Sequence, residues 1–180
     1  MTRVAIQGVR GSYSEEAAMN VFGDDARVVE CMNFEATFAA LRTGAADHAV
    51  IPVENKIVGR IAATSKLLRV HRNPVIEKLP IRVRHVLAGV PDASFDDITS
   101  VRSHIEALKQ CRRFFAKNEH IRQVVGADTA SSIRNVIREG DIANAAICSR
   151  RAAELYGADI LLETVADDVD NWTVFYVIGN

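Results

Sequence analysis

Short apolar runs alternate with helical hydrophobic patterns from the first residues of the chain onward. The helix predicted after the first run begins at Ser12, which has the spacing of a capping box with Glu15, and ends at Gly23. Its apolar positions recur every three to four residues, as on the buried face of a helix. The same pattern predicts strands at 4–6, 27–31 and 49–53, a helix between Asn33 and Gly44, and a helix over 62–68.

An extended stretch over 75–90 separates this part of the chain from a second part with the same alternation. We expect the chain to cross into a second lobe there. In that lobe, one helix face is predicted from Ala107, Leu108, Cys111 and Phe115, and Asp128 is expected to cap another helix. The remaining predicted strands lie at 98–101, 124–126, 145–148 and 172–178.

This alternation of strands and helices is typical of an α/β protein with open, largely parallel sheets. Polar clusters stand where the predicted strands end, and ligands of open sheets bind at the carboxyl ends of the strands. Each cluster also has a simpler interpretation as a helix cap, which Ser, Thr, Asn and Asp often provide for stability alone. The clusters are Gly11-Ser12-Tyr13-Ser14, Glu54-Asn55-Lys56, Ser103-His104 and Asp128-Thr129.

Composition narrows the class of protein. The 180 residues are 48% hydrophobic and 25% charged, a composition that excludes intrinsic disorder. The net charge of -1 gives no excess of positive charge that would attract nucleic acid or an anionic membrane. We expect no signal peptide and no membrane-spanning segment, because no apolar run is long enough. The 3 cysteines are widely spaced and form no CxxC pair, so we expect reduced thiols in a cytoplasmic protein.

Single residues allow several kinds of chemistry. His104 beside Ser103 has the residue types of a base and a nucleophile, but no GxSxG elbow surrounds them. Glu54 is expected to shape its loop by accepting hydrogen bonds rather than to act as an acid or base. The histidines show no metal-ligand spacing, so we expect no metal site. Gly8 and Gly11 only partly match a dinucleotide-binding loop, which needs a third glycine in register.

Taken in order, these clusters resemble the prephenate dehydratase domain, and the plant arogenate dehydratases in particular. The resemblance covers essentially the whole chain. Its motifs are 4–15, 50–55, Ser103-His104 with 107–108 and 110–111, 128–130, 145–147, 151–157, and Asn171 with Thr173 and Phe175.

The resemblance implies a two-lobed fold of the periplasmic-binding-protein type (type II), with the active site in a cleft and the last strand back in the first lobe. We expect the first lobe to comprise 1–76 and 165–180 and the second lobe 77–164. The family's essential threonine falls on Thr173, which we expect to be catalytic. The residues expected to bind substrate are Ser12, Tyr13, Ser14, Glu54, Asn55, Lys56, Ser103, His104, Asp128, Thr129, Ala130, Asn171 and Phe175.

The resemblance also implies a lyase that removes carbon dioxide and water from prephenate or arogenate, giving phenylpyruvate or phenylalanine in aromatic amino acid biosynthesis. No cofactor is expected. The expected partners are a small dicarboxylate substrate and further copies of the chain in a homodimer or larger oligomer, with no nucleic acid and no membrane. Two alternatives stay open: an enzyme similar to prephenate decarboxylases, or a module that binds an aromatic acid without reaction.

Three segments depart from the family pattern. Val174 stands in place of the arginine of the family's Thr-Arg-Phe motif, and Lys56 in place of the serine after Glu-Asn. Ile105-Glu106 replaces the Pro-Gln that usually follows Ser-His. We expect Lys56 to supply the positive charge that Val174 cannot supply. We also expect that this chain carries no regulatory domain of the ACT type.

Overall fold

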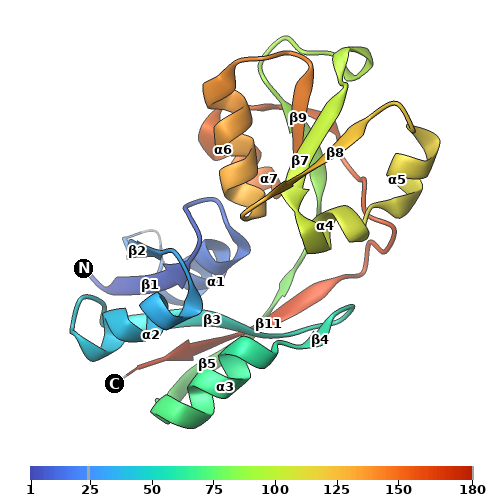
Figure 1. The fold of residues 1–180 in the computed structure, drawn as a ribbon. Helices are drawn as coiled ribbons and strands as arrows, with labels where there is room; N and C mark the ends of the chain where they lie inside the picture. The colour runs from blue at the N-terminus through green and yellow to red at the C-terminus, as the bar shows by residue number, and fades with distance from the viewer. Residues whose placement is uncertain (24, 180) are drawn as a thin grey trace. The chain divides into compact units, whose positions relative to one another are not determined.

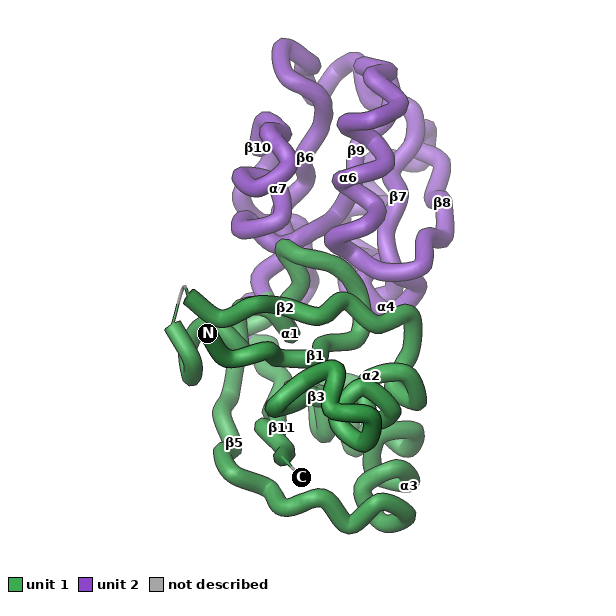
Figure 2. The backbone as a smooth tube through the Cα atoms, turned by 90° about the vertical axis from the view of Figure 1, so that its left-hand side faces the viewer, with its two compact units in different colours: residues 1–83, 171–180 green, residues 84–170 purple. Residues whose placement is uncertain are grey.

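The computed structural model describes residues 1–23 and 25–179, and the chain divides into two compact units. Unit 1 comprises Met1–Val83 and Asn171–Asn180, and unit 2 comprises Arg84–Asp170 (Figure 2). These boundaries differ from the 76/77 and 164/165 expected from the sequence. The first boundary shifts because strand β5 (Val75–Arg82) pairs with the last strand, β11 (Trp172–Ile178), and so belongs to the sheet of unit 1. The second shifts because Val165 packs in the core of unit 2.

The sheet of unit 1 has the strand order β2-β1-β3-β11-β5, with β4 paired to β3. Neighbouring strands β1, β2 and β3 are parallel, whereas β11 runs antiparallel to both β3 and β5. Figure 1 shows that β11, in red, the last strand of the chain, lies in this sheet beside strands from the first half of the chain. The remaining strands are β1 (Arg3–Gln7), β2 (Arg27–Cys31), β3 (His48–Asn55) and β4 (Gly59–Arg60).

Helices pack on both faces of this sheet because successive strand residues point to opposite faces. Helix α1 (Tyr13–Phe22) packs on one face, where Ala17 and Ala18 join a core cluster with Val50 and Phe175. Helix α2 (Phe34–Arg42) packs on the other face together with α3 (Ala62–His71). The core of that second face contains Ala5, Ile51, Phe38, Leu41 and Ile178.

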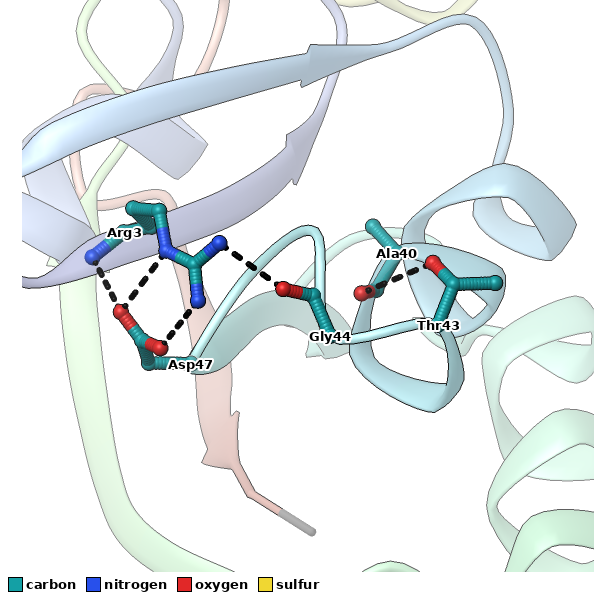
Figure 3. A network of polar contacts seen from close by, with 5 residues as sticks. All are labelled: Arg3, Ala40, Thr43, Gly44 and Asp47. Carbon is teal, nitrogen blue, oxygen red and sulfur yellow. Dashed lines mark hydrogen bonds and ion pairs between the residues drawn. The ribbon is translucent and has the colours of Figure 1, made fainter.

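A polar clamp closes the amino-terminal end of β1 and β3 (Figure 3). The Nη2 atom of Arg3 lies 2.6 Å from Oδ1 of Asp47, and its Nη1 donates to the Gly44 carbonyl at 2.8 Å. The hydrogen bonds that the Arg3 side chain and the Arg3 backbone N–H donate to Asp47 lower the pKa of that carboxyl group to about 2. The clamp therefore lies at the end of the strands opposite to the predicted site.

The sheet of unit 2 has the strand order β10-β6-β9-β7-β8. Strand β7 is parallel to β8 and to β9, and β6 is antiparallel to β9 and β10. Helix α6 packs against β7 and β9, and helices α4 and α5 contribute to a core cluster with Val101 and Ile147. The strands are β6 (Val86–Gly89), β7 (Ser100–His104), β8 (Arg122–Gly126), β9 (Asn144–Cys148) and β10 (Asp159–Leu162). The helices are α4 (Ile105–Lys109), α5 (Arg112–Lys117), α6 (Thr129–Glu139) and α7 (Arg150–Tyr156).

The single helix expected around Cys111 is two helices. The backbone N–H of Cys111 donates to the Leu108 carbonyl in a tight turn that ends α4. The carboxylate of Asp167 then accepts hydrogen bonds from the N–H groups of Arg112 and Arg113, each at 2.9 Å, and starts α5. The stretch over 75–90, expected to be extended, contains two strands, and the short elements β4, β10 and a 3-10 turn at Phe95–Asp97 were not predicted.

Candidate functional site

The predicted catalytic residue Thr173 lies directly opposite Asn55. The two residues are paired in the antiparallel register of β11 and β3. Both are almost fully buried, with 7% of Thr173 and 8% of Asn55 exposed. The structure therefore brings together two predicted site residues that are far apart in the sequence.

Hydrogen bonds fix the orientation of the Asn55 amide. Its Oδ1 atom accepts from the backbone N–H groups of Ile57 at 2.9 Å and Val58 at 3.0 Å. Because the N–H groups of Ile57 and Val58 need an acceptor, the Asn55 oxygen must face them, and the Asn55 Nδ2 group therefore points to the opposite side. There it donates to Oγ1 of Thr173 at 2.9 Å, and it lies 3.1 Å from both Asn171 Oδ1 and the Trp172 carbonyl.

This arrangement determines what the Thr173 hydroxyl can do. A hydroxyl group has one hydrogen to donate and two lone pairs that accept. Because Asn55 uses Thr173 Oγ1 as an acceptor, the hydroxyl hydrogen is not consumed in their hydrogen bond. Thr173 is therefore oriented so that its hydrogen can be donated to another group.

The cluster Glu54-Asn55-Lys56 does not start a helix, contrary to the sequence-based interpretation of such clusters. Glu54 and Asn55 end strand β3, and Lys56 begins a turn into β4. The turn forms because Asn55 Oδ1 binds the two following N–H groups, and the Lys56 N–H donates to the Trp172 carbonyl at 3.0 Å. Glu54 and Lys56 are both exposed, whereas Asn55 between them is buried.

Val174 lies on the opposite face of β11 from Thr173. Thr173 and Phe175 are buried, while Val174 between them is only partly buried, as expected for alternating residues of a strand. Val174 is paired with Glu54 of β3 and Pro80 of β5. An arginine at this position would therefore lie beside the Glu54 carboxylate. That Lys56 compensates for Val174 stays a prediction.

The segment Ser12-Tyr13-Ser14 follows the carboxyl end of β1 and begins α1. Ser12 caps the helix, with its Oγ accepting from the Glu15 N–H at 3.3 Å. Tyr13 packs against the core cluster that contains Phe175, and Ser14 is buried. Since β1 and β3 are parallel, this segment and Asn55 lie at the same end of the sheet.

The sequence pattern predicts only a capping role for Glu15 and no functional role for Arg10. The Glu15 side chain is fully buried, and its carboxylate accepts from the Gly11 N–H at 2.6 Å and from Arg10 Nε at 3.1 Å. A capping-box pattern gives no signal for such burial. The sequence neighbours Ser14 and Glu16 are polar, so the hydrophobic pattern gives no further signal that Glu15 is buried.

In unit 2, the predicted residues lie at the carboxyl ends of β7 and β8. Ser103 is fully buried and donates to the Ile147 carbonyl at 2.7 Å. His104 caps α4, with Nδ1 accepting from the Glu106 N–H at 3.3 Å. Both side chains thus bond to backbone groups, and they do not form the nucleophile and base pair that their residue types allow.

Asp128, Thr129 and Ala130 form the start of α6. Asp128 is its N-cap and accepts from the Ser131 N–H at 2.6 Å. Ala130 is fully buried and Thr129 is partly buried. His104 is paired with Gly126 in the register of β7 and β8, which places these helix starts at one end of the sheet of unit 2.

Within residues 1–23 and 25–179, no cluster of three or more His, Cys, Asp or Glu side chains is arranged to hold a metal ion. In the same described part of the chain, no helix has the length and apolar composition needed to cross a membrane.

Comparison with models of known protein families identifies the family of this chain. The model of the family described as prephenate dehydratase matches residues 4–180. The chain belongs to the prephenate dehydratase family. Arogenate dehydratase/prephenate dehydratase 1, chloroplastic, from Arabidopsis thaliana is 40% identical over 177 residues, covering 98% of this chain and 45% of the relative. The chain thus spans about half the length of such relatives.

Solved structures share the fold. Prephenate dehydratase from Arthrobacter aurescens, solved in complex with L-Phe, has a TM-score of 0.89 at 27% identity, over 99% of this chain and 60% of that chain. A structure described as GqqA, a novel type of quorum quenching acylases, has a TM-score of 0.87 at 30% identity, over 99% and 64%. A periplasmic substrate-binding protein of an ABC transporter from Coxiella burnetii, 13% identical with a TM-score of 0.50 over 99% and 84%, shows the fold alone. The expected α/β fold of the periplasmic-binding-protein type is confirmed.

Proposed function

We propose that this protein is a lyase that converts prephenate or arogenate to phenylpyruvate or phenylalanine, with loss of carbon dioxide and water. The observation that carries the proposal is the Asn55–Thr173 hydrogen bond, which leaves the threonine hydrogen available as a donor. Membership of the prephenate dehydratase family supports it.

The proposed reaction balances without a cofactor. The bond from the ring to the carboxylate breaks, and its electron pair enters the ring as carbon dioxide leaves. The bond to the ring hydroxyl then breaks with its electron pair, and the departing hydroxide takes a proton from solvent to become water. A hydrogen bond from Thr173 to that oxygen stabilises the developing negative charge, and one such donor typically contributes ~10²-fold or more in rate.

The remaining predicted residues have binding roles in this proposal. Tyr13 supplies apolar surface for the substrate ring, and Phe175, which is 3% exposed, belongs to the core cluster against which Tyr13 packs. Asn171 and Asn55 hold Thr173 in place. Ser12, Ser14, Glu54, Lys56 and the residues of unit 2 (Ser103, His104, Asp128, Thr129 and Ala130) stay predicted substrate-binding residues.

The decisive experiment supplies the purified protein with prephenate and, in parallel, with arogenate at neutral pH. Formation of phenylpyruvate or phenylalanine faster than the acid-catalysed background is the expected result. Binding without turnover would contradict the enzyme and support an aromatic-acid binding module. A product that retains the ring hydroxyl would identify a decarboxylase instead.

We further propose that the protein is cytoplasmic and that it forms a homodimer or a larger homo-oligomer. We propose no nucleic-acid partner. The three cysteines are buried and form no disulfide, as expected for thiols of a reducing compartment. The name of the Arabidopsis relative assigns that protein to the chloroplast. Sedimentation equilibrium measures the subunit number directly, and a monomer at micromolar concentration would contradict the oligomer.

A further inference from the structure

A charge pair with unequal exposure joins the loop after β1 to the first turn of α1. Glu15 is fully buried, whereas 58% of the Arg10 side chain is exposed. The Nε atom of Arg10 lies 3.1 Å from Oε1 of Glu15, and the second carboxylate oxygen, Oε2, accepts from the Gly11 N–H at 2.6 Å. A buried carboxylate thus holds a guanidinium group at the surface of unit 1.

Stability alone does not account for this pair. Burying a carboxylate costs several kcal/mol of desolvation, and a buried ion pair is often no more stabilising than apolar residues of the same volume. The buried Glu15 carboxylate does, however, fix the position of the Arg10 guanidinium, more than half of which is exposed.

The pair lies at the end of the sheet that carries the predicted site. Arg10 follows the carboxyl end of β1, and its backbone N–H donates to Glu30 of the neighbouring strand β2 at 2.8 Å. Asn55 stands at the carboxyl end of β3, which is parallel to β1. Ligands of open α/β sheets bind at this end.

We propose that Arg10, positioned by the buried carboxylate of Glu15, binds a carboxylate group of the substrate. This inference rests on the proposed function, because it assigns the anion to the dicarboxylate substrate of that reaction. A guanidinium carries five N–H donors in a planar fork, so it can bond to a protein carboxylate through Nε and to a ligand carboxylate as well. Arg10 is a binding residue in this scheme, and Glu15 is a positioning residue.

The first test replaces Arg10 with Gln or Lys and measures KM, kcat and the affinity for prephenate. Arg10→Gln is expected to raise KM by ~10-fold or more, as for loss of a charge-assisted hydrogen bond, with a smaller effect on kcat. Arg10→Lys should fall between this variant and the unmodified protein. The matched control is Asp47→Asn, which breaks an arginine–carboxylate pair at the opposite end of the same strands and should leave KM unchanged.

The second test asks whether Glu15 acts through Arg10. Glu15→Gln alone should raise KM several-fold, and in the Arg10→Gln background it should add little, because both changes remove one interaction with the ligand. Melting temperatures show whether each variant is folded. Should Glu15→Gln fail to fold, the Arg10 variants decide the proposal by themselves, since Arg10 is exposed.

The outcomes separate the two proposals. Turnover by the unmodified protein together with an unchanged KM in Arg10→Gln overturns the role of Arg10 and leaves the proposed function standing. Fully additive effects of the two substitutions overturn the positioning role of Glu15. Absence of both prephenate binding and turnover in the unmodified protein overturns the proposed function and this inference with it.

Discussion

The side-chain amide of Asn55 donates a hydrogen bond of 2.9 Å to the Oγ1 atom of Thr173, across neighbouring antiparallel strands. The direction of this bond matters more than its length. Asn55 is locked by two backbone N–H groups on its other side, so it can act only as a donor toward Thr173. Thr173 consequently keeps its hydrogen for the leaving group of the proposed reaction.

Replacing Thr173 with valine should lower kcat by ~10²-fold or more, because it removes one donor to the transition state. Valine keeps the volume and the strand propensity of threonine, so the melting temperature should change little. The measurement is steady-state kinetics with prephenate beside thermal unfolding. An unchanged rate would remove Thr173 from catalysis.

Replacing Asn55 with aspartate tests the direction of the hydrogen bond. An ionised carboxylate only accepts, so Thr173 would have to donate its hydrogen to it and lose it for the substrate. We expect kcat to fall to a level close to that of Thr173→Val, and the double variant to be no slower than either single one. Independent, multiplying losses in the double variant would show that the two residues act separately.

The Lys56 and Val174 substitutions form a second pair to test together. Lys56→Ser should weaken binding of the dicarboxylate, and Val174→Arg in that background should recover much of the affinity. Val174→Arg should remain folded, because Val174 is only partly buried and is paired with Glu54. The measurements are ligand affinity and melting temperature for both single variants and the double. Additive effects on affinity would contradict the compensation.

Buried His85 should make stability depend on pH. Burial lowers its pKa from 6.5 to about 4 in the folded state, while its Nε2 lies 3.1 Å from Gln110 Oε1. Between these pH values the unfolded chain binds more protons than the folded one, so stability falls as the pH falls from 6.5 to 4. The shift corresponds to roughly 3 kcal/mol of unfolding free energy.

Denaturant unfolding at pH 7, 5.5 and 4 measures this slope. His85→Gln should flatten it, whatever the stability of that variant at pH 7. The control is His120→Gln, because His120 is exposed and should leave the slope as it is. A slope that is equally steep with and without His85 would assign the acid sensitivity to other groups.

Several elements could be predicted because their signals are local. The strands over 27–31 and 172–178 have the bounds expected from their apolar runs, and Ser12, Asn33 and Asp128 cap helices as expected. A cap depends on one side chain and on N–H groups two or three residues later. Such short-range rules can be read from the order of residues.

The break between α4 and α5 could not be predicted in this way. The apolar positions Ala107, Leu108, Cys111 and Phe115 fit one continuous helix face. The carboxylate that starts α5 belongs to Asp167, 55 residues after Arg112. A local pattern contains no information about a partner at that distance.

The sequence by itself determined the α/β class, the family resemblance and the choice of Thr173, because motifs and periodicity are properties of residue order. Only the tertiary structure decided that Asn55, 118 residues earlier, orients the Thr173 hydroxyl, and that Val174 faces away from it beside Glu54. It also decided that Glu15 is buried and holds Arg10. The physical reason is that hydrogen-bond direction and burial depend on strand pairing and packing between distant segments, which residue order alone leaves open.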